Sequence, residues 1–143
     1  MENKLVFRRL TESDYNTICE WWKWWRWSVM PKESLPDDGK SGFMVEKNNI
    51  PIVCCFLFIT NSKWAKLEWV VSNPKYKEKD RKKIIRLLVE KVEKEAEKIG
   101  IMQLFTICMN DHMTNIHKDL DWILMPVQNE GFKYLTNNFI KQK

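Results

Sequence analysis

The chain has 143 residues, the length of about one domain. Its 44% hydrophobic and 30% charged residues are typical of a globular fold and exclude a disordered or fibrous chain. No apolar run approaches the ~18 residues that a membrane-spanning helix needs, and the N-terminal MENKLVFRRL lacks the features of a signal peptide. We therefore expect a single cytoplasmic domain over residues 1–143.

The charge is mildly basic, with a net charge of +5 and a sequence pI of about 9.0. Much of it lies in Lys75–Lys83 and in Lys141 and Lys143. This balance fits a nucleic acid, an acidic partner or a phosphate-bearing ligand, and favours none of them alone. A nucleic-acid interface has the least support, because the basic run holds one aromatic residue, Tyr76, and no RNA- or DNA-binding motif accompanies it.

The cysteine pattern predicts neither a disulfide framework nor a metal site. No CxxC or Cys/His metal spacing occurs among Cys19, Cys54, Cys55 and Cys108. Cys54 and Cys55 are neighbours in a strand-like run, so their side chains should point to opposite faces of a sheet. Free thiols in a reducing compartment are the simplest interpretation.

The first half of the chain predicts one helix among four strands. Thr11 or Ser13 is expected to cap a helix from about Asp14 to Trp27. Asn48-Asn49 is a turn pair that tolerates positive φ and should join two strands into a hairpin. The expected strands are Leu5–Arg9, Gly42–Lys47, Ile50–Thr60 and Trp64–Val71.

The second half begins with a long amphipathic helix over about Lys79–Ile99, followed by Gly100 as its C-terminal cap. The elements expected after it are a strand over Met102–Met109, a short helix over Met113–Leu120, and strands over Trp122–Val127 and Phe132–Ile140. The order β-α-β-β-β-α-β-α-β-β predicts an α/β (α+β) fold with a mixed sheet covered by helices.

The middle of the chain combines a strand, a basic loop and a helix start. The strand ends at Asn73-Pro74, and the lysine-rich loop leads directly into the long helix. Unpaired backbone N–H groups at a helix N-terminus, beside lysines and arginines, form a site suited to an anionic phosphate.

This unit and two further segments carry a family resemblance. Val70–Tyr76 looks like a strand ending in a Val…Pro-x-Tyr turn, and Asn110–Trp122 has the spacing of N-x-x-A-x-x-L-Y-x-x-L-G-F. Over Phe7–Ile140 the chain resembles the GNAT superfamily of acyl-CoA-dependent N-acetyltransferases. The resemblance implies a mostly antiparallel central sheet with helices on both faces, acetyl-CoA as cosubstrate, no metal, and an amine acceptor that is a small molecule or a peptide.

The cofactor loop departs from that family. Lys77–Lys82 aligns with the signature Arg/Gln-x-x-Gly-x-Gly/Ala, and Asp80 and Lys82 fill its two small positions. Glycine there lets the backbone approach a diphosphate, whereas a carboxylate at Asp80 repels phosphate unless it points away. Asp80 is alternatively a helix N-cap. The cations expected to hold the anion by charge instead, with greater salt sensitivity, are Lys77, Lys79, Arg81, Lys82 and Lys83.

The resemblance also implies a chemistry in which an amine attacks an acyl thioester held beside Val70 and Val71. Glu68 is then the candidate base or amine-positioning carboxylate; the alternative is an outward-facing residue, or one paired with Lys66 or a lysine of a neighbouring strand. His117 stands at the family's tyrosine position and is the candidate acid for the leaving thiolate, with a surface histidine as the alternative. Asn110 is a candidate contact of the pantetheine arm or, alternatively, a helix or turn cap.

Five tryptophans crowd residues 21–27 and cannot share one helix face. With Trp21 as the origin, the pattern predicts Trp21, Trp24 and Trp25 in the core and Trp22 and Trp27 partly exposed. In the resembling family this helix borders the acceptor side, so Trp22 and Trp27 are candidates for substrate stacking or a protein interface; core packing is the alternative. The sequence thus leaves two functions open: an N-acetyltransferase, or an inactive GNAT-fold interaction module.

Overall fold

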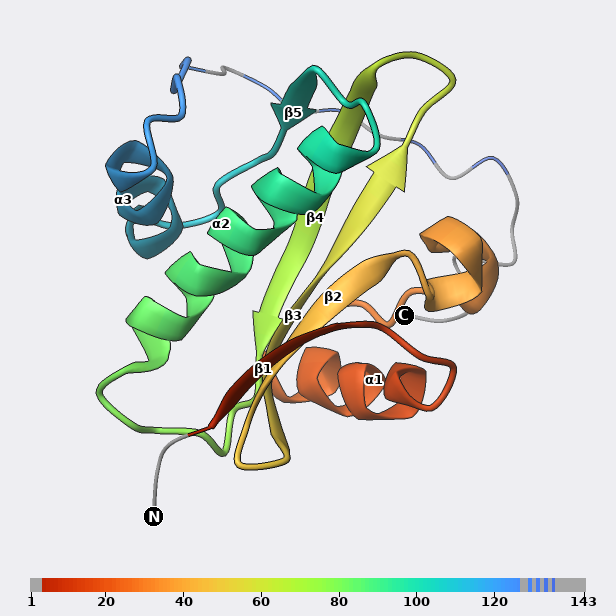
Figure 1. Cartoon of the computed structure of the whole chain (residues 1–143). Helices are drawn as coiled ribbons and strands as arrows, with labels where there is room; N and C mark the ends of the chain where they lie inside the picture. Colours follow the sequence, from red (N-terminus) through yellow and green to blue (C-terminus); the bar gives the residue numbers. More distant parts are fainter. Residues whose placement is uncertain (1–3, 127–128, 130, 132, 134, 136–143) are drawn as a thin grey trace.

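The computed structural model describes residues 4–126 and the single positions 129, 131, 133 and 135. Within this part, five strands form one sheet in the order β1-β2-β3-β4-β5 (Figure 1). The pairs β1–β2, β2–β3 and β3–β4 are antiparallel, and the pair β4–β5 is parallel. The strands are β1 (Leu5–Arg9), β2 (Gly42–Lys47), β3 (Ile50–Ile59), β4 (Trp64–Ser72) and β5 (Gln103–Phe105).

Helices cover both faces of this sheet, as Figure 1 shows for α1 and α2. They are α1 (Asp14–Trp24), α2 (Arg81–Lys98) and α3 (Asp111–Asp119), with short 3-10 turns at Lys32–Ser34 and Pro36–Gly39. None of the described helices is both long and apolar enough to cross a membrane. The predicted mixed, mostly antiparallel sheet with helices on both faces is confirmed.

Two hydrophobic clusters lie on opposite faces of the sheet. On one face Ile18 and Trp22 of α1 pack with Cys54, and on the other Leu88 of α2 packs with Cys55. The alternation of a strand places these neighbouring thiols on different faces, as predicted. Both are fully buried, and burial raises the pKa of each thiol, to about 12 for Cys55.

All three α-helices end in a Schellman motif, in which a residue with positive φ turns the chain back over the last carbonyls. The residues in that position are Arg26 (φ 63°), Gly100 (φ 89°) and Asp121 (φ 67°). In α1 the N–H of Arg26 donates to the Lys23 carbonyl and that of Trp27 to the Trp22 carbonyl. This turn explains why α1 ends at Trp24 rather than at the predicted Trp27.

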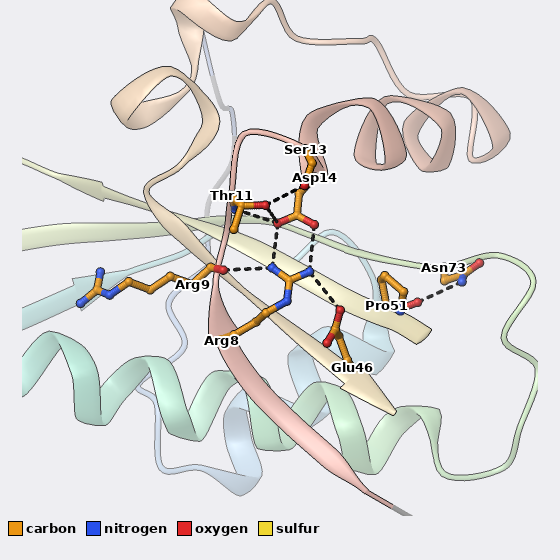
Figure 2. Close-up of polar contacts among 8 residues, drawn as sticks. All are labelled: Arg8, Arg9, Thr11, Ser13, Asp14, Glu46, Pro51 and Asn73. Carbon is orange, nitrogen blue, oxygen red and sulfur yellow. Dashed lines mark hydrogen bonds and ion pairs between the residues drawn. The ribbon is translucent and has the colours of Figure 1, made fainter. Parts of the chain in front are cut away.

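The start of α1 is fixed by a carboxylate rather than by the predicted cap. Ser13 occupies the N-cap position without a side-chain cap bond, and Thr11 instead donates its N–H and its hydroxyl to Asp14. The Arg8 guanidinium donates two hydrogen bonds to Asp14 and one to Glu46 of β2 (Figure 2). Burial acts to raise the pKa of Asp14, but Arg8 and Thr11 hold it below its ordinary value. This network joins β1, β2 and α1.

The C-terminal predictions hold less well. Pairing in β5 stops at Phe105, so the strand predicted over Met102–Met109 is too long. Residues 122–126 form no strand, contrary to the prediction for Trp122–Val127. The strand predicted over Phe132–Ile140 lies largely outside the described residues.

Candidate active site

The parallel strands β4 and β5 separate after three paired positions. Trp64–Lys66 of β4 pairs with Gln103–Phe105 of β5, and side chains then bridge the gap. The Thr106 hydroxyl donates to the Leu67 carbonyl at 2.7 Å, and the Ile107 N–H donates to Glu68 Oε1 at 3.2 Å. Because side-chain atoms replace a backbone partner in these bonds, the strands cannot keep ladder spacing beyond this point.

A bulge in β4 adds to this separation. The register between β3 and β4 shifts between Cys54 and Phe56, and Trp69 has a φ of 51°. Positive φ is unfavourable for a residue with a bulky side chain, so surrounding contacts must hold it. The Trp69 ring meets Trp22, Phe56 and Phe58 edge-on at centroid distances of 5.6–6.3 Å. A bulge bends its strand, and this one lies directly before Val70 and Val71.

A cleft of about 460 Å³ opens beside the bulge. Residues from β4, the start of α2, the start of α3 and the segment after α1 all line it. Its lining comprises Trp25, Trp27, Val70, Val71, Ser72, Glu78, Lys79, Arg81, Lys82, Ile85, Asn110, His112, Met113 and Ile116. Since α1 and α2 cover opposite faces of the sheet, the cleft receives residues from both faces (Figure 1).

The α2 end of the cleft carries positive charge and unpaired donors. Lys79, Arg81 and Lys82 line it and form no ion pair with any residue the structure describes. The backbone N–H groups of Lys82 and Lys83, in the first turn of α2, have no hydrogen-bond partner in this part of the chain. One carboxylate, that of Glu78, also lines the cleft. The arrangement suits an anion with several oxygens.

No protein-family model matches the sequence, and no curated protein matches it. Solved structures do match its fold. The ribosomal-protein-S18-alanine N-acetyltransferase of Escherichia coli superposes with a TM-score of 0.67 at 18% identity, over 82% of this chain and 76% of that one. N-acetylglutamate synthase from Neisseria gonorrhoeae, complexed with coenzyme A and L-arginine, gives 0.66 at 15% identity, over 82% of this chain and 27% of that one. Aminoglycoside N-acetyltransferase AAC(6')-Iy in complex with CoA gives 0.60 at 12% identity, over 93% and 97%.

The chain has the GNAT fold. At these identities the likeness establishes the fold alone. The predicted fold is therefore confirmed, and the roles of individual residues depend on the geometry of this chain.

The cleft brings together most of the predicted cofactor residues. Val70, Val71, Lys79, Arg81, Lys82 and Asn110 all line it, whereas Lys77 and Lys83 do not. Asn110 is the N-cap of α3, and its Oδ1 accepts the Met113 N–H at 3.0 Å. The predicted capping alternative is confirmed for Asn110, which also lines the cleft.

The Asp80 side chain is not the predicted helix cap, and its carboxylate is bonded elsewhere, as the prediction required if phosphate is not to be repelled. It occupies the N-cap position of α2 but makes no side-chain cap bond. Its carboxylate accepts hydrogen bonds from Lys47 Nζ, at 2.7 Å, and from the Tyr76 hydroxyl. Asp80 is not among the cleft-lining residues, so its carboxylate points away from the cleft.

Glu68 bridges the separated strands. Besides accepting the Ile107 N–H, it lies 3.8 Å from Lys66 Nζ, which confirms the predicted alternative of pairing with Lys66. Glu68 does not line the cleft, so its catalytic role stays a prediction.

His117 lies inside the protein, so the surface alternative is wrong. It is 1% exposed, packs edge-on against Trp122, and has Nδ1 2.7 Å from the Met113 carbonyl. A carbonyl only accepts, so Nδ1 carries the proton of the neutral ring. Nε2 has no partner among the described residues, and burial lowers the pKa of His117. A neutral ring with its proton already bonded is poorly suited to the predicted acid role, and His117 does not line the cleft.

The tryptophan assignment needs two corrections. Trp22 is 1% exposed and belongs to the core, so it is not available to a substrate or partner. Trp24, predicted in the core, is 59% exposed. The buried face of α1 follows Ile18, with Trp21, Trp22 and Trp25 at the next three, four and seven positions. The buried face of α1 is therefore centred on the side that contains Ile18, and taking Trp21 as the origin assigned Trp22 and Trp24 to the wrong sides of the helix.

Several cleft residues escaped the sequence analysis. The Trp25 indole donates to the Ser72 carbonyl at 2.9 Å, and its ring lines the cleft. Trp27, which was a predicted candidate, also lines the cleft. His112 and Met113 lie in the first turn of α3. Their positions directly after Asn110 were the available signal, because residues that follow a strand end at a cleft tend to line it.

Proposed function

We propose that this protein is an acetyl-CoA-dependent N-acetyltransferase. The observation that supports this most is the cleft between β4 and the segment after β5, which joins Val70 and Val71 to the cationic start of α2. Two of the three structures compared above are N-acetyltransferases and the third is N-acetylglutamate synthase. Two of the three contain CoA.

The residues present fit the phosphate groups of this cosubstrate. Lys79, Arg81 and Lys82 supply charge, and the backbone N–H of Lys82, which has no partner among the described residues, supplies a directed donor. Val70 and Val71 would contact the apolar part of the arm, and Asn110 would offer its remaining amide atoms. When bound, acetyl-CoA supplies the activated acyl thioester.

The amine acceptor would enter beside Trp25 and Trp27, which form the aromatic wall of the cleft. Its nitrogen forms a bond to the acyl carbon as the carbon–sulfur bond breaks. The amine loses one proton and the departing thiolate gains one, so the transfer needs no redox partner. Glu68 and His117 are the residues predicted from the sequence to transfer these protons. His112, unlike either of them, lines the cleft and is a third candidate for proton transfer.

The second candidate function is an inactive interaction module. It is favoured by one observation, the exposure of Trp24 (59%) and Trp27 (38%) at the end of α1, because large apolar rings are seldom left in water without a partner.

Isothermal titration with acetyl-CoA tests the proposal. Binding is expected at low ionic strength and should weaken in about 0.15 M salt, where screening acts over ~8 Å. Replacing two cleft cations in Lys79→Ala/Lys82→Ala should weaken binding at least about tenfold. The matched control is Lys91→Ala/Lys94→Ala, which removes the same charge from exposed positions of α2. Absence of binding at low salt would reject the enzyme in favour of the module.

Turnover is then measured as thiol release with a panel of amines. Glu68→Gln, His112→Ala and His117→Phe are compared at equal fold content. A fall in kcat with an unchanged affinity for acetyl-CoA identifies the proton carrier. Equal turnover in all three variants would mean that water alone moves the proton.

A further inference from the structure

The loop between β4 and α2 lacks glycine but is held in place by side chains at two points. The first is Asn73, whose backbone N–H donates to the Ile52 carbonyl at 2.7 Å. Its side-chain amide donates to the Pro51 carbonyl at 3.0 Å (Figure 2). Its Oδ1 accepts the Lys75 N–H at 2.9 Å. These bonds attach the first residues of the loop to β3.

The second point is a cluster of Lys47, Tyr76 and Asp80, here named the loop clamp. Lys47 at the end of β2 donates to the Tyr76 hydroxyl at 3.1 Å and to Asp80 at 2.7 Å, and the Tyr76 hydroxyl donates to the other Asp80 oxygen. The Lys47 side chain is only 14% exposed. The clamp attaches the last residue of the loop to β2.

The clamp also neutralises the carboxylate of Asp80 at the N-cap position of α2, whereas Glu78, two residues earlier, lines the cleft. The hydrogen bond from Lys47 lowers the pKa of Asp80, and the bond to Asp80 raises the pKa of Lys47 to about 12, so both are charged at neutral pH. The negative charge of Asp80 is therefore balanced by Lys47 and leaves Lys79, Arg81 and Lys82 to face the cleft.

In the loop clamp the Asp80 oxygens bond to Lys47 and Tyr76 and to no backbone N–H of α2. An aspartate at an N-cap normally accepts the N–H of the second or third helical residue. Here those residues are Lys82 and Lys83, and Asp80 bonds to neither. With φ −87° and ψ 5°, its backbone lies outside the extended region that capping uses. Both donors thus stay available to a ligand.

We propose that Lys47 is a positioning residue for the anion site: it holds the Asp80 carboxylate off the N-terminus of α2, so that a chain without loop glycines can still bind a diphosphate. This inference rests on the proposed function. Without Lys47, the Asp80 carboxylate keeps only the Tyr76 hydroxyl as a partner, and its unbalanced negative charge beside the first turn of α2 repels phosphate.

The test is a charge-rescue series with CoA as the probe, titrated by calorimetry at low ionic strength. Lys47→Met should weaken CoA binding about tenfold, because the negative charge of Asp80 is then unbalanced near the bound phosphates. Lys47→Met/Asp80→Gly should return the Kd to within about threefold of the wild-type value, because the competing carboxylate is gone. Lys63→Met, in the turn at the opposite end of the sheet, controls for net charge and should bind as the wild type does.

Each outcome is decisive. An unchanged Kd in Lys47→Met, with a wild type that binds, overturns the clamp and leaves the proposed function intact. Equal weakening in the single and double variants also overturns it, since Lys47 would then act through its own charge. Wild-type protein that does not bind CoA overturns both proposals. Thermal melting of each variant shows whether a weakened Kd comes from unfolding, and Asp80→Gly alone, which should bind at least as well as the wild type, tests the clamp if Lys47→Met does not fold.

Discussion

Trp69 permits a direct test of the bulge that opens the cleft. Its φ of 51° is a conformation in which a Cβ atom costs about 1–2 kcal/mol. In an ordinary extended strand, glycine is instead about 0.5–1 kcal/mol less stable than alanine. The stability order of Trp69→Gly and Trp69→Ala therefore reports the backbone conformation at this position.

Both variants lose the ring contacts with Trp22, Phe56 and Phe58. A fully buried tryptophan replaced by alanine costs about 3–5 kcal/mol, and Trp69 is only half-buried, so we expect a loss of about 2–3 kcal/mol from the ring alone. Trp69→Gly should then be more stable than Trp69→Ala by about 1 kcal/mol, the reverse of the strand order.

Urea unfolding followed by circular dichroism measures both free energies on one scale. Since the two variants share the lost ring, their difference is insensitive to the size of that loss. If the alanine variant is the more stable of the two, position 69 is extended, the bulge is absent, and the cleft cannot arise as described.

Three further predictions concern other parts of the fold. Burial depresses the folded-state pKa of His117 below 6.5, so its contribution to stability is present above about pH 6.5 and is lost as the pH falls through the folded pKa. His117→Asn should therefore flatten the dependence of the unfolding free energy on pH between about pH 7 and 5. An unchanged slope would assign this pH dependence to other groups. Gly42→Ala should lower the free energy of unfolding by about 3 kcal/mol or more, because the added Cβ would lie 2.2 Å from the Cys55 carbonyl oxygen, and a loss under about 1 kcal/mol would contradict that packing. Gly100→Ala meets no atom within 4 Å, so its loss should be only about 1 kcal/mol, from the φ of 89° alone; a loss as large as that of Gly42→Ala would reveal an unseen contact.

The strands and long helix could be predicted because their signals are local. The alternation in β1–β4 and the stripe of Ile84, Leu88 and Val92 in α2 depend on spacing within one segment. The hairpin at Asn48-Asn49 likewise follows from two residues that tolerate positive φ, which are 53° and 67° in the structure.

The site depends on contacts between distant residues, and these left weaker signals. Lys47 and Asp80 are separated by 33 positions, and neither residue alone indicates the pair. His117 is buried by the ring of Trp122, in a segment predicted to be a strand. The predicted burial of Trp22 and Trp24 was reversed, because the buried face of a helix is set by the residues it packs against and not by the densest run of aromatic residues.

The distribution of local costs bears on the choice between enzyme and interaction module. The positive φ of Trp69 and the N–H groups of Lys82 and Lys83, which are uncapped within the described residues, are local costs, and both lie at or beside the cleft, next to Lys79, Arg81 and Lys82. A module that binds through Trp24, the more exposed of the two rings, gains nothing from these features, because Trp24 lies outside the cleft lining, whereas Trp27 lies within it. A site for a diphosphate-bearing thioester uses all of them: the bulge separates the strands, and the free donors and cations bind the anion. The strain therefore favours a ligand in the cleft over a partner on the tryptophan surface.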